Sequence, residues 1–234
     1  MLIRALKQLS LKLSTDVAPW YRHAVATEPS TAPDEAAVDG RHLRRDRNRD
    51  AVIEALLVLF REGNLEPSTD EIAARSGVSA RSLFRYFDDV DDLCRAAISQ
   101  QQHDVAHLFT VAATPDLPTA TKVTALVRQR VDLFEAIQHV ATVVRLRAPF
   151  QPIVRDNLTR NRSVLRDHLA TLFAPELASM PDAVAASRLA AADVAASFES
   201  WWLWRDDQGL TTKKAAAVLT DTLLVLFTTP EERR

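Results

Sequence analysis

Arg81 and Arg85 are the residues whose types and spacing best suit a chemical task, the recognition of an acceptor-rich polyanion. Residues four apart in a helix share one face, so the two guanidinium groups would project from a common stripe. A guanidinium can donate paired hydrogen bonds to the edge of a guanine or to a phosphate. The spacing therefore indicates a contact with nucleic acid. The alternative is an ordinary helix pair whose arginines form only a solvated surface.

Two short helices joined by a turn would hold these arginines, in the segment 68–87 that reads STDEIAARSGVSARSLFRYF. Ser68 or Thr69 can cap the first helix, whose positive N-terminal end also suits the acidic residues that follow. Gly77 suits the turn because glycine adopts a positive φ at little cost. This is the layout of a helix-turn-helix, whose second helix enters the DNA major groove.

The second helix of this pair is expected to run from its cap, Ser79, to about Phe87. Leu83 and Phe87 are four residues apart, so they can anchor the helix while the arginines face outward. The flanking segments supply two further helices. Residues 49–61 carry apolar side chains at helical spacing, and Asp88 and Asp89 can begin a third helix with Leu93 on its buried face.

A family resemblance follows from these positions. The sequence resembles the N-terminal domain of TetR-type transcriptional regulators over roughly residues 44–97, and the matching positions are Ile53, Phe60, Arg61, Glu62, Gly63, Thr69, Ile72, Ala73, Ser76, Gly77, Val78, Ser79, Leu83, Phe84, Arg85, Tyr86, Phe87 and Leu93. The resemblance implies a homodimeric repressor that binds a near-palindromic operator and releases it when a small molecule binds.

The resemblance also implies roles for individual residues. Thr69, Ser82 and Tyr86 would contact phosphates, while Ala80, Arg81, Phe84 and Arg85 would face bases or the groove wall. The predicted DNA-binding set is Arg44, Arg45, Thr69, Ser79, Ala80, Arg81, Ser82, Phe84, Arg85 and Tyr86.

Two positions depart from the family pattern. Phe84 stands where the family commonly has Tyr, and Val90 where it commonly has Lys. Val90 also lies within the acidic run Asp88–Asp92, whose carboxylates favour a helix N-terminus but would repel phosphates. The resemblance therefore leaves this chain with fewer phosphate contacts than the family pattern has.

A basic segment precedes the helix pair. Residues 41–49 contain five arginines, and residues 41–87 contain nine arginines against seven acidic residues, although the whole chain has a net charge of −2. We expect this segment to act as an arm that follows phosphates or enters the minor groove. The alternative is the solvated first turns of a helix.

Composition and length place these features in a larger protein. With 234 residues, 47% hydrophobic residues and four glycines, we expect an all-α chain. The predicted domains are residues 1–43, an N-terminal extension and linker that is partly disordered; residues 44–97, the helix-turn-helix domain; and residues 98–234, a helical ligand-binding and dimerisation domain. The single cysteine, Cys94, is expected to be a small core residue rather than a redox sensor.

The N-terminal extension carries Leu2, Leu6, Leu9 and Leu13 at amphipathic spacing. It is either peripheral to the activity or a short helix that contacts a membrane surface, a partner or the protein itself. It lacks the pattern of a secretory signal, and no apolar run reaches the roughly 20 residues of a membrane span, so we expect a cytoplasmic protein.

Beyond residue 98 four helices are predicted, at Thr119–Arg147, Pro152–Phe173, Pro181–Asp207 and Thr212–Thr228. The last two are expected to form a dimer interface, as a four-helix bundle, through Ala190, Val194, Trp201, Leu219, Leu223 and Leu226. Candidate effector-binding residues are Phe134, Gln138, His139, Arg145 and Trp202. For each set the alternative is ordinary burial or solvation within one subunit.

Sequence signatures of catalysis are absent from the chain. It has no GxSxG, P-loop, GxGxxG or HExxH motif, so we expect no enzyme activity, catalytic residue, metal or cofactor. The expected partners are double-stranded DNA, a second copy of the chain and an unidentified small molecule. The alternative function is that of a helical interaction protein that does not bind DNA and uses the amphipathic N-terminal segment.

Overall fold

The computed structural model describes residues 40–228, with side chains from Arg44 onward. Every regular element in this range is helical, which confirms the all-α fold class. The described residues form two compact units, one of residues 40–106 with 137–158 and the other of residues 107–136 with 159–228. The helix-turn-helix residues therefore share a unit with residues beyond 98. The predicted domain boundaries stay predictions, and the leucines at 2, 6, 9 and 13 lie outside the described residues.

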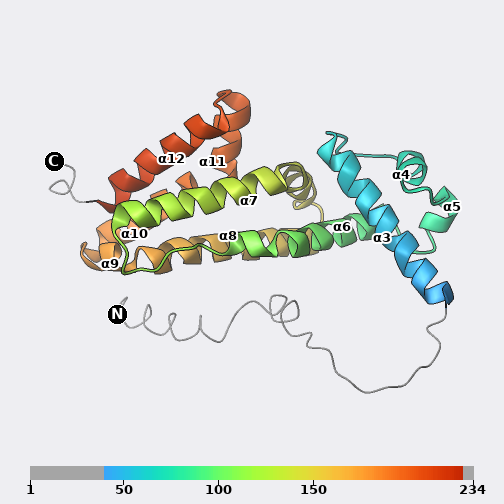
Figure 1. The fold of residues 1–234 in the computed structure, drawn as a ribbon, viewed down its shortest axis with the longest axis horizontal. Helices are drawn as coiled ribbons and strands as arrows, with labels where there is room; N and C mark the ends of the chain where they lie inside the picture. The colour runs from blue at the N-terminus through green and yellow to red at the C-terminus, as the bar shows by residue number, and fades with distance from the viewer. Residues whose placement is uncertain (1–39, 229–234) are drawn as a thin grey trace, which may run out of the picture. The chain divides into compact units, whose positions relative to one another are not determined.

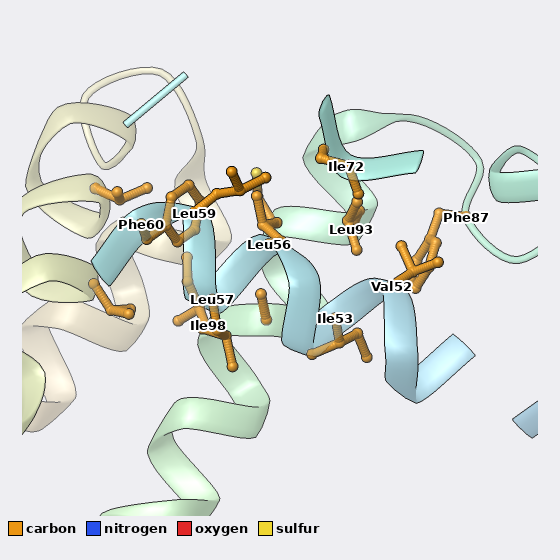
Figure 2. Close-up of a cluster of buried hydrophobic side chains, with 14 of the residues drawn as sticks. Val52, Ile53, Leu56, Leu57, Leu59, Phe60, Ile72, Phe87, Leu93 and Ile98 are labelled. Atoms are coloured by element: carbon orange, nitrogen blue, oxygen red, sulfur yellow. The ribbon is translucent and has the colours of Figure 1, made fainter. Parts of the chain in front are cut away.

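The first unit contains α3 (Gly40–Arg61), α4 (Thr69–Ser76), α5 (Ala80–Leu83) and α6 (Val90–Asp104), together with parts of α7 (Thr119–Arg147) and α8 (Pro152–Leu172). Helix α3 packs against both α4 and α6 (Figure 1). Its buried stripe includes Val52, Leu56 and Phe60, none of which is exposed to solvent. Figure 2 shows Phe87 beside Val52, and Ile72 beside Leu93. One hydrophobic core therefore fixes both helices of the hairpin against their neighbours.

Cys94 belongs to this core, as expected. Burial raises the pKa of its thiol to about 11, because the thiolate is poorly solvated there. The sulfur is therefore a small apolar packing group at neutral pH.

Two predicted elements of this unit differ in the structure. The expected arm, residues 41–49, instead belongs to α3, which begins at Gly40. The second hairpin helix is shorter than expected, because α-helical geometry ends at Leu83. After Leu83 the amides of Arg85 and Tyr86 bond to carbonyls three residues back. These tighter turns suit a run of aromatic residues, which have low helix propensity, just before a new helix begins.

The second unit contains the remaining parts of α7 and α8, with η1 (Ala106–Phe109, a 3₁₀ turn) at the boundary. It also contains α9 (Ala174–Ala178), α10 (Asp182–Ala195), α11 (Phe198–Trp202), a π-helical turn η2 (Leu203–Asp207) and α12 (Thr212–Phe227). Helices α10 and α12 pack together (Figure 1). The rings of Phe173 and Phe227 stack in parallel with their centroids 4.0 Å apart.

The helix predicted over Pro181–Asp207 is broken. The first part, α10, ends at Ala195, and Ser197 caps α11 by accepting a hydrogen bond from the Ser200 amide. Serine competes for such cap positions because its hydroxyl can satisfy an amide at the helix start. None of the described helices is both long enough and apolar enough to cross a membrane.

Candidate nucleic-acid interface

The first hairpin helix, α4, is fixed at both ends. Ser68 and Glu71 form a capping box, in which the Glu71 amide donates to Ser68 Oγ and the Ser68 amide donates to a Glu71 carboxylate oxygen at 2.8 Å. The hydrogen bonds from Ser68 hold the pKa of Glu71 below its usual value. Gly77 closes the other end with φ 70°, and its amide donates to the Ala73 carbonyl. The predicted cap and turn are both present.

The second hairpin helix, α5, begins at its predicted cap. Ser79 accepts a hydrogen bond from the Ser82 amide, and its hydroxyl lies 3.0 Å from the Ser82 hydroxyl. Leu83 and Phe87 are both buried, as their spacing predicted. The guanidinium carbon of Arg49 lies 5.2 Å from the centre of the Phe87 ring, a cation–π contact from α3. The α-helical segment is short, and its buried anchors Leu83 and Phe87 hold it against the core.

Three predicted contact residues stand out from the buried anchors. Arg81, Phe84 and Arg85 are exposed, and Phe84 keeps 52% of its surface accessible although it is a large apolar residue. The half-buried Ala80, Ser82 and Tyr86 lie around them in the chain. An exposed aromatic ring in the same short segment as two exposed arginines suits a groove wall that offers thymine methyls as well as acceptors.

Two other arginines of this unit already have carboxylate partners. Arg75 makes two hydrogen bonds of 2.7 Å to the Glu62 carboxylate, and Arg61 pairs with Glu54. Neither Arg81 nor Arg85 has a hydrogen bond or an ion pair with any side chain between residues 44 and 228. Arg61 and Arg75 are thus already engaged by carboxylates, whereas Arg81 and Arg85 remain available to a polyanion.

Tyr86 has a partner that the sequence did not indicate. The Asn48 side-chain amide donates to the Tyr86 hydroxyl at 3.1 Å, from the basic stretch of α3. Since the tyrosine oxygen accepts this bond, its own hydrogen remains able to donate. The Asn48–Tyr86 hydrogen bond therefore holds the Tyr86 hydroxyl in place as a possible donor, and it joins α3 to the end of the hairpin.

Three carboxylates of the acidic run Asp88–Asp92 make hydrogen bonds or ion pairs within the structure. Asp89 caps α6 by accepting from the Asp92 amide at 2.6 Å, Asp91 pairs with Arg147 at 2.7 Å, and Asp92 pairs with Arg95 at 3.3 Å. These contacts account for acidic residues at this helix start and partly neutralise them. Arg147 could not be assigned this role from the sequence, because it lies 56 residues further along the chain.

The remaining predicted DNA contacts lie on neighbouring elements. Arg44 and Arg45 are exposed in the first turns of α3, and Thr69 is half-buried in the first turn of α4. No partner nucleic acid is present, so the contact set stays a prediction.

The predicted effector and dimer residues are dispersed. Phe134 is buried in the second unit, where its ring and that of Trp202 both contact Phe198. Gln138, His139 and Arg145 are half-buried and belong to the first unit. Among the predicted dimer residues, Ala190 and Val194 are exposed, Leu226 is half-buried, and Trp201, Leu219 and Leu223 are buried within the subunit. No metal-binding cluster of His, Cys, Asp or Glu occurs among the described residues.

Comparison with known families locates a match at the hairpin and its flanks. Residues 52–97 match the model of the bacterial regulatory proteins of the tetR family. The matched range contains α4, α5 and the first half of α6. The search of curated proteins found no match.

Solved structures with similar folds are transcriptional regulators or ligand-binding proteins. A transcriptional regulator from Rhodococcus sp. Rha1 aligns with a TM-score of 0.58 and 15% identity, covering 80% of this chain and 99% of its own. A TetR-like regulator from Rhodococcus sp. RHA1 aligns at 0.52 and 17% identity, covering 82% and 96%. The multidrug binding protein EbrR, complexed with imidazole, aligns at 0.53 and 22% identity, covering 86% and 99%.

These likenesses extend over most of the chain but at low identity, so they establish the fold, while the matched model identifies the helix-turn-helix. The matched family consists of regulatory proteins, and the similar solved structures are those of transcriptional regulators and of a multidrug binding protein. The chain therefore has the fold of TetR-like transcriptional regulators, and residues 52–97 match the DNA-binding helix-turn-helix of the tetR family of bacterial regulatory proteins.

Proposed function

We propose that this protein is a homodimeric repressor that binds a near-palindromic operator through Arg81, Phe84 and Arg85 and releases it when a small molecule binds. The observation that carries the proposal is the exposed and unpaired state of both arginines on a capped and buried hairpin, within the described residues. Arginines that already had carboxylate partners would lose those bonds on meeting DNA. Arg81 and Arg85 have no such bonds to lose.

We propose that other residues contact phosphates, in addition to the base contacts of Arg81, Phe84 and Arg85. Arg44 and Arg45 lie near the start of α3 and have no carboxylate partner among the described residues. Their guanidinium groups can therefore contact the phosphates of the DNA backbone. The Tyr86 hydroxyl, held by Asn48, can donate to a phosphate in place of the hydroxyl that Phe84 lacks. We therefore assign specificity to α5 and orientation to α3 and Tyr86.

Dimerisation is proposed through the exposed face of α10 and α12. On α10, four exposed residues recur at spacings of three and four, and they are Val184, Ser187, Ala191 and Val194. On α12 the exposed Val218 and Val225 share a face that differs from the one carrying the buried Leu219 and Leu223. Small side chains allow two helix pairs to approach closely, and association of the pairs would bury these valines. A dimer would place two helix-turn-helix hairpins for the two halves of an operator.

Effector release is proposed through α7. This helix carries the buried Phe134 in the second unit and ends at Arg147, which pairs with Asp91 at the start of α6. EbrR, a protein of similar fold, is a multidrug binding protein and was crystallised with imidazole. A ligand that shifts α7 would also shift its last turn, and hence the helix that follows the hairpin.

Binding to DNA from the region flanking the gene tests the proposal. We expect salt-dependent, sequence-specific binding by the full chain, and a loss of roughly 1–3 kcal/mol of discrimination in Arg81→Ala. Arg128→Ala is the matched control, because Arg128 is an exposed arginine of the second unit. Specific binding that Arg81→Ala leaves unchanged would reject the groove assignment. An absence of salt-dependent binding to any DNA would reject the function.

A further inference from the structure

Arg130, in the middle of α7, is a fully buried cation with 0% of its surface exposed. Its guanidinium group donates to two acceptors, the Gln129 side-chain oxygen and the Leu165 carbonyl. Its Nε is shut off from solvent and has no hydrogen-bond partner. Buried polar groups in folded proteins are nearly always bonded, so the unpartnered Nε points to something that completes the group.

The positive charge of Arg130 also lacks an ion-pair partner among the described residues. Among the side chains that the structure describes, no carboxylate oxygen lies within ion-pair distance of its nitrogens. Asp193 favours the charged form of Arg130, and the Arg130 charge in turn opposes the rise that burial causes in the pKa of Asp193, but the ion pair of Asp193 is with Arg166 at 3.9 Å. Burial lowers the pKa of Arg130 to about 10, which still leaves it charged at neutral pH.

Lys122 provides an internal comparison on the same helix. It is buried almost as completely, but its ammonium donates to the Glu176 carboxylate at 2.7 Å and to the Pro115 carbonyl at 3.0 Å. It also lies 5.4 Å from the centre of the Phe173 ring. Lys122 therefore has a carboxylate and a carbonyl as partners, whereas Arg130 has no carboxylate partner among the described residues. An isolated buried charge is unfavourable, so an anion bound there would be strongly held.

A second unsatisfied group lies on α8, the helix whose Leu165 carbonyl accepts from Arg130. The Nδ1 atom of His168 is buried and has no hydrogen-bond partner. His168 is one turn along α8 from Leu165, the residue whose carbonyl accepts from Arg130. Burial and, to a smaller extent, the charge of Arg130 lower the pKa of His168 to about 4. A carboxylate has two oxygens and can accept from both.

Aromatic side chains lie one turn further along α7. Phe134 is four residues from Arg130 and so shares its helix face. Its ring meets the Phe198 ring edge to face at a centroid distance of 5.7 Å and lies 6.3 Å from the Trp201 ring. These three rings are buried, so they give the neighbourhood of Arg130 an apolar and aromatic character.

We propose that Arg130 and His168 bind the carboxylate of an organic acid whose apolar body packs toward Phe134, Phe198 and Trp201. The inference rests on the proposed effector-responsive function, and it names the chemical class of the effector. A neutral compound of the same shape would leave Arg130 without an ion-pair partner and would bind more weakly.

The test measures binding to the full chain without DNA, so it is separate from operator recognition. The probes are benzoate, phenylacetate and hexanoate, each paired with its neutral amide, and the readouts are the melting temperature and titration calorimetry. We expect at least one acid to raise the melting temperature, and its amide to bind at least about tenfold more weakly. Equal effects of acid and amide, or no effect of any acid, would overturn the proposal. Either result would assign the unpartnered atoms to ordered water.

Two sets of variants tie the binding to these residues. Arg130→Met removes the charge but keeps the length of the side chain, and we expect it to abolish the acid-induced shift while leaving the melting temperature of the free protein equal or higher. Arg128→Met, an exposed arginine two residues away, is the control and should keep the full shift. Arg130→Lys and His168→Gln, which are milder changes, should each weaken acid binding. An undiminished shift in Arg130→Met, or in both milder variants if Arg130→Met does not fold, would overturn the assignment.

Discussion

Arg147, in the last turn of α7, donates a hydrogen bond from Nη1 to Oδ1 of Asp91, in the first turn of α6, over 2.7 Å. Both residues belong to the compact unit that contains the helix-turn-helix. The arginine side chain is mostly buried, whereas about half of the aspartate remains accessible. The pair therefore joins the end of the longest helix to the segment that immediately follows Phe87.

Breaking this pair should reduce stability by a modest amount. We expect Arg147→Met to lower the free energy of unfolding by about 1 kcal/mol, because the pair is only partly shielded from water. In a double-mutant cycle with Asp91→Asn, measured by urea denaturation, the coupling energy should be about 0.5–1 kcal/mol. Arg128→Met, which loses only an exposed contact to Asp132, is the control. Fully additive effects would mean that the pair contributes nothing.

Phe84 should affect DNA binding far more than folding. Because half of the ring is exposed, we expect Phe84→Ala to change the free energy of unfolding by about 0.5 kcal/mol or less. Phe84→Tyr adds a hydroxyl that can donate to a phosphate, and we expect about a two- to tenfold gain in affinity. The salt dependence should not change, since a neutral hydroxyl displaces no counterion. Fluorescence anisotropy at three salt concentrations measures both quantities, and unchanged binding in both variants would place Phe84 outside the interface.

Features of the fold that depend on residues close together in the sequence were predictable. The cap at Ser68, the turn at Gly77 and the anchors Leu83 and Phe87 depend on neighbours within a few residues, and all occur as expected. The same holds for α7, whose predicted bounds at Thr119 and Arg147 match the structure, because a proline-rich break and Pro149 delimit it.

Features set by distant partners were not predictable. The contacts of Asn48 with Tyr86 and of Arg147 with Asp91 join residues 38 and 56 positions apart, so no local pattern indicates them. Helical periodicity also failed to identify Arg130 as buried, because a charged residue between apolar positions usually marks a solvated face. The break after Ala195 was missed because the alanine-rich stretch is helical by propensity throughout.

Charged substitutions on α10 and α12 should separate dimerisation from folding. Val194 is 66% exposed and Val225 is 53% exposed in the single chain, so we expect Val194→Glu and Val225→Glu to fold and to sediment as monomers. Leu223 is 0% exposed, so Leu223→Glu should unfold the chain because it buries an unpaired charge. Sedimentation velocity with circular dichroism distinguishes these results. A dimer that survives both valine substitutions would place the interface elsewhere.

Stability should depend on pH through His168. Burial, reinforced by the charge of Arg130, lowers the pKa of this residue from 6.5 to about 4. The unfolded chain therefore takes up a proton near pH 6.5, while the folded protein resists it. The stability associated with neutral His168 is complete above pH 6.5 and is lost as the pH falls toward 4, by at most about 1.4 kcal/mol per pH unit.

Two carboxylates in the same neighbourhood act in the opposite direction. Burial raises the pKa values of Asp167 and Asp193, despite the nearby charge of Arg166, so each favours the folded state more as it becomes protonated. The total pH profile therefore mixes both signs, and the His168 contribution is the difference between the wild type and His168→Gln. Urea denaturation from pH 7.5 to 4.5 should show a smaller loss of stability in His168→Gln than in the wild type, whereas His107→Gln, at an exposed histidine, should follow the wild type. Parallel curves for all three proteins would mean that His168 is protonated equally in the folded and unfolded states.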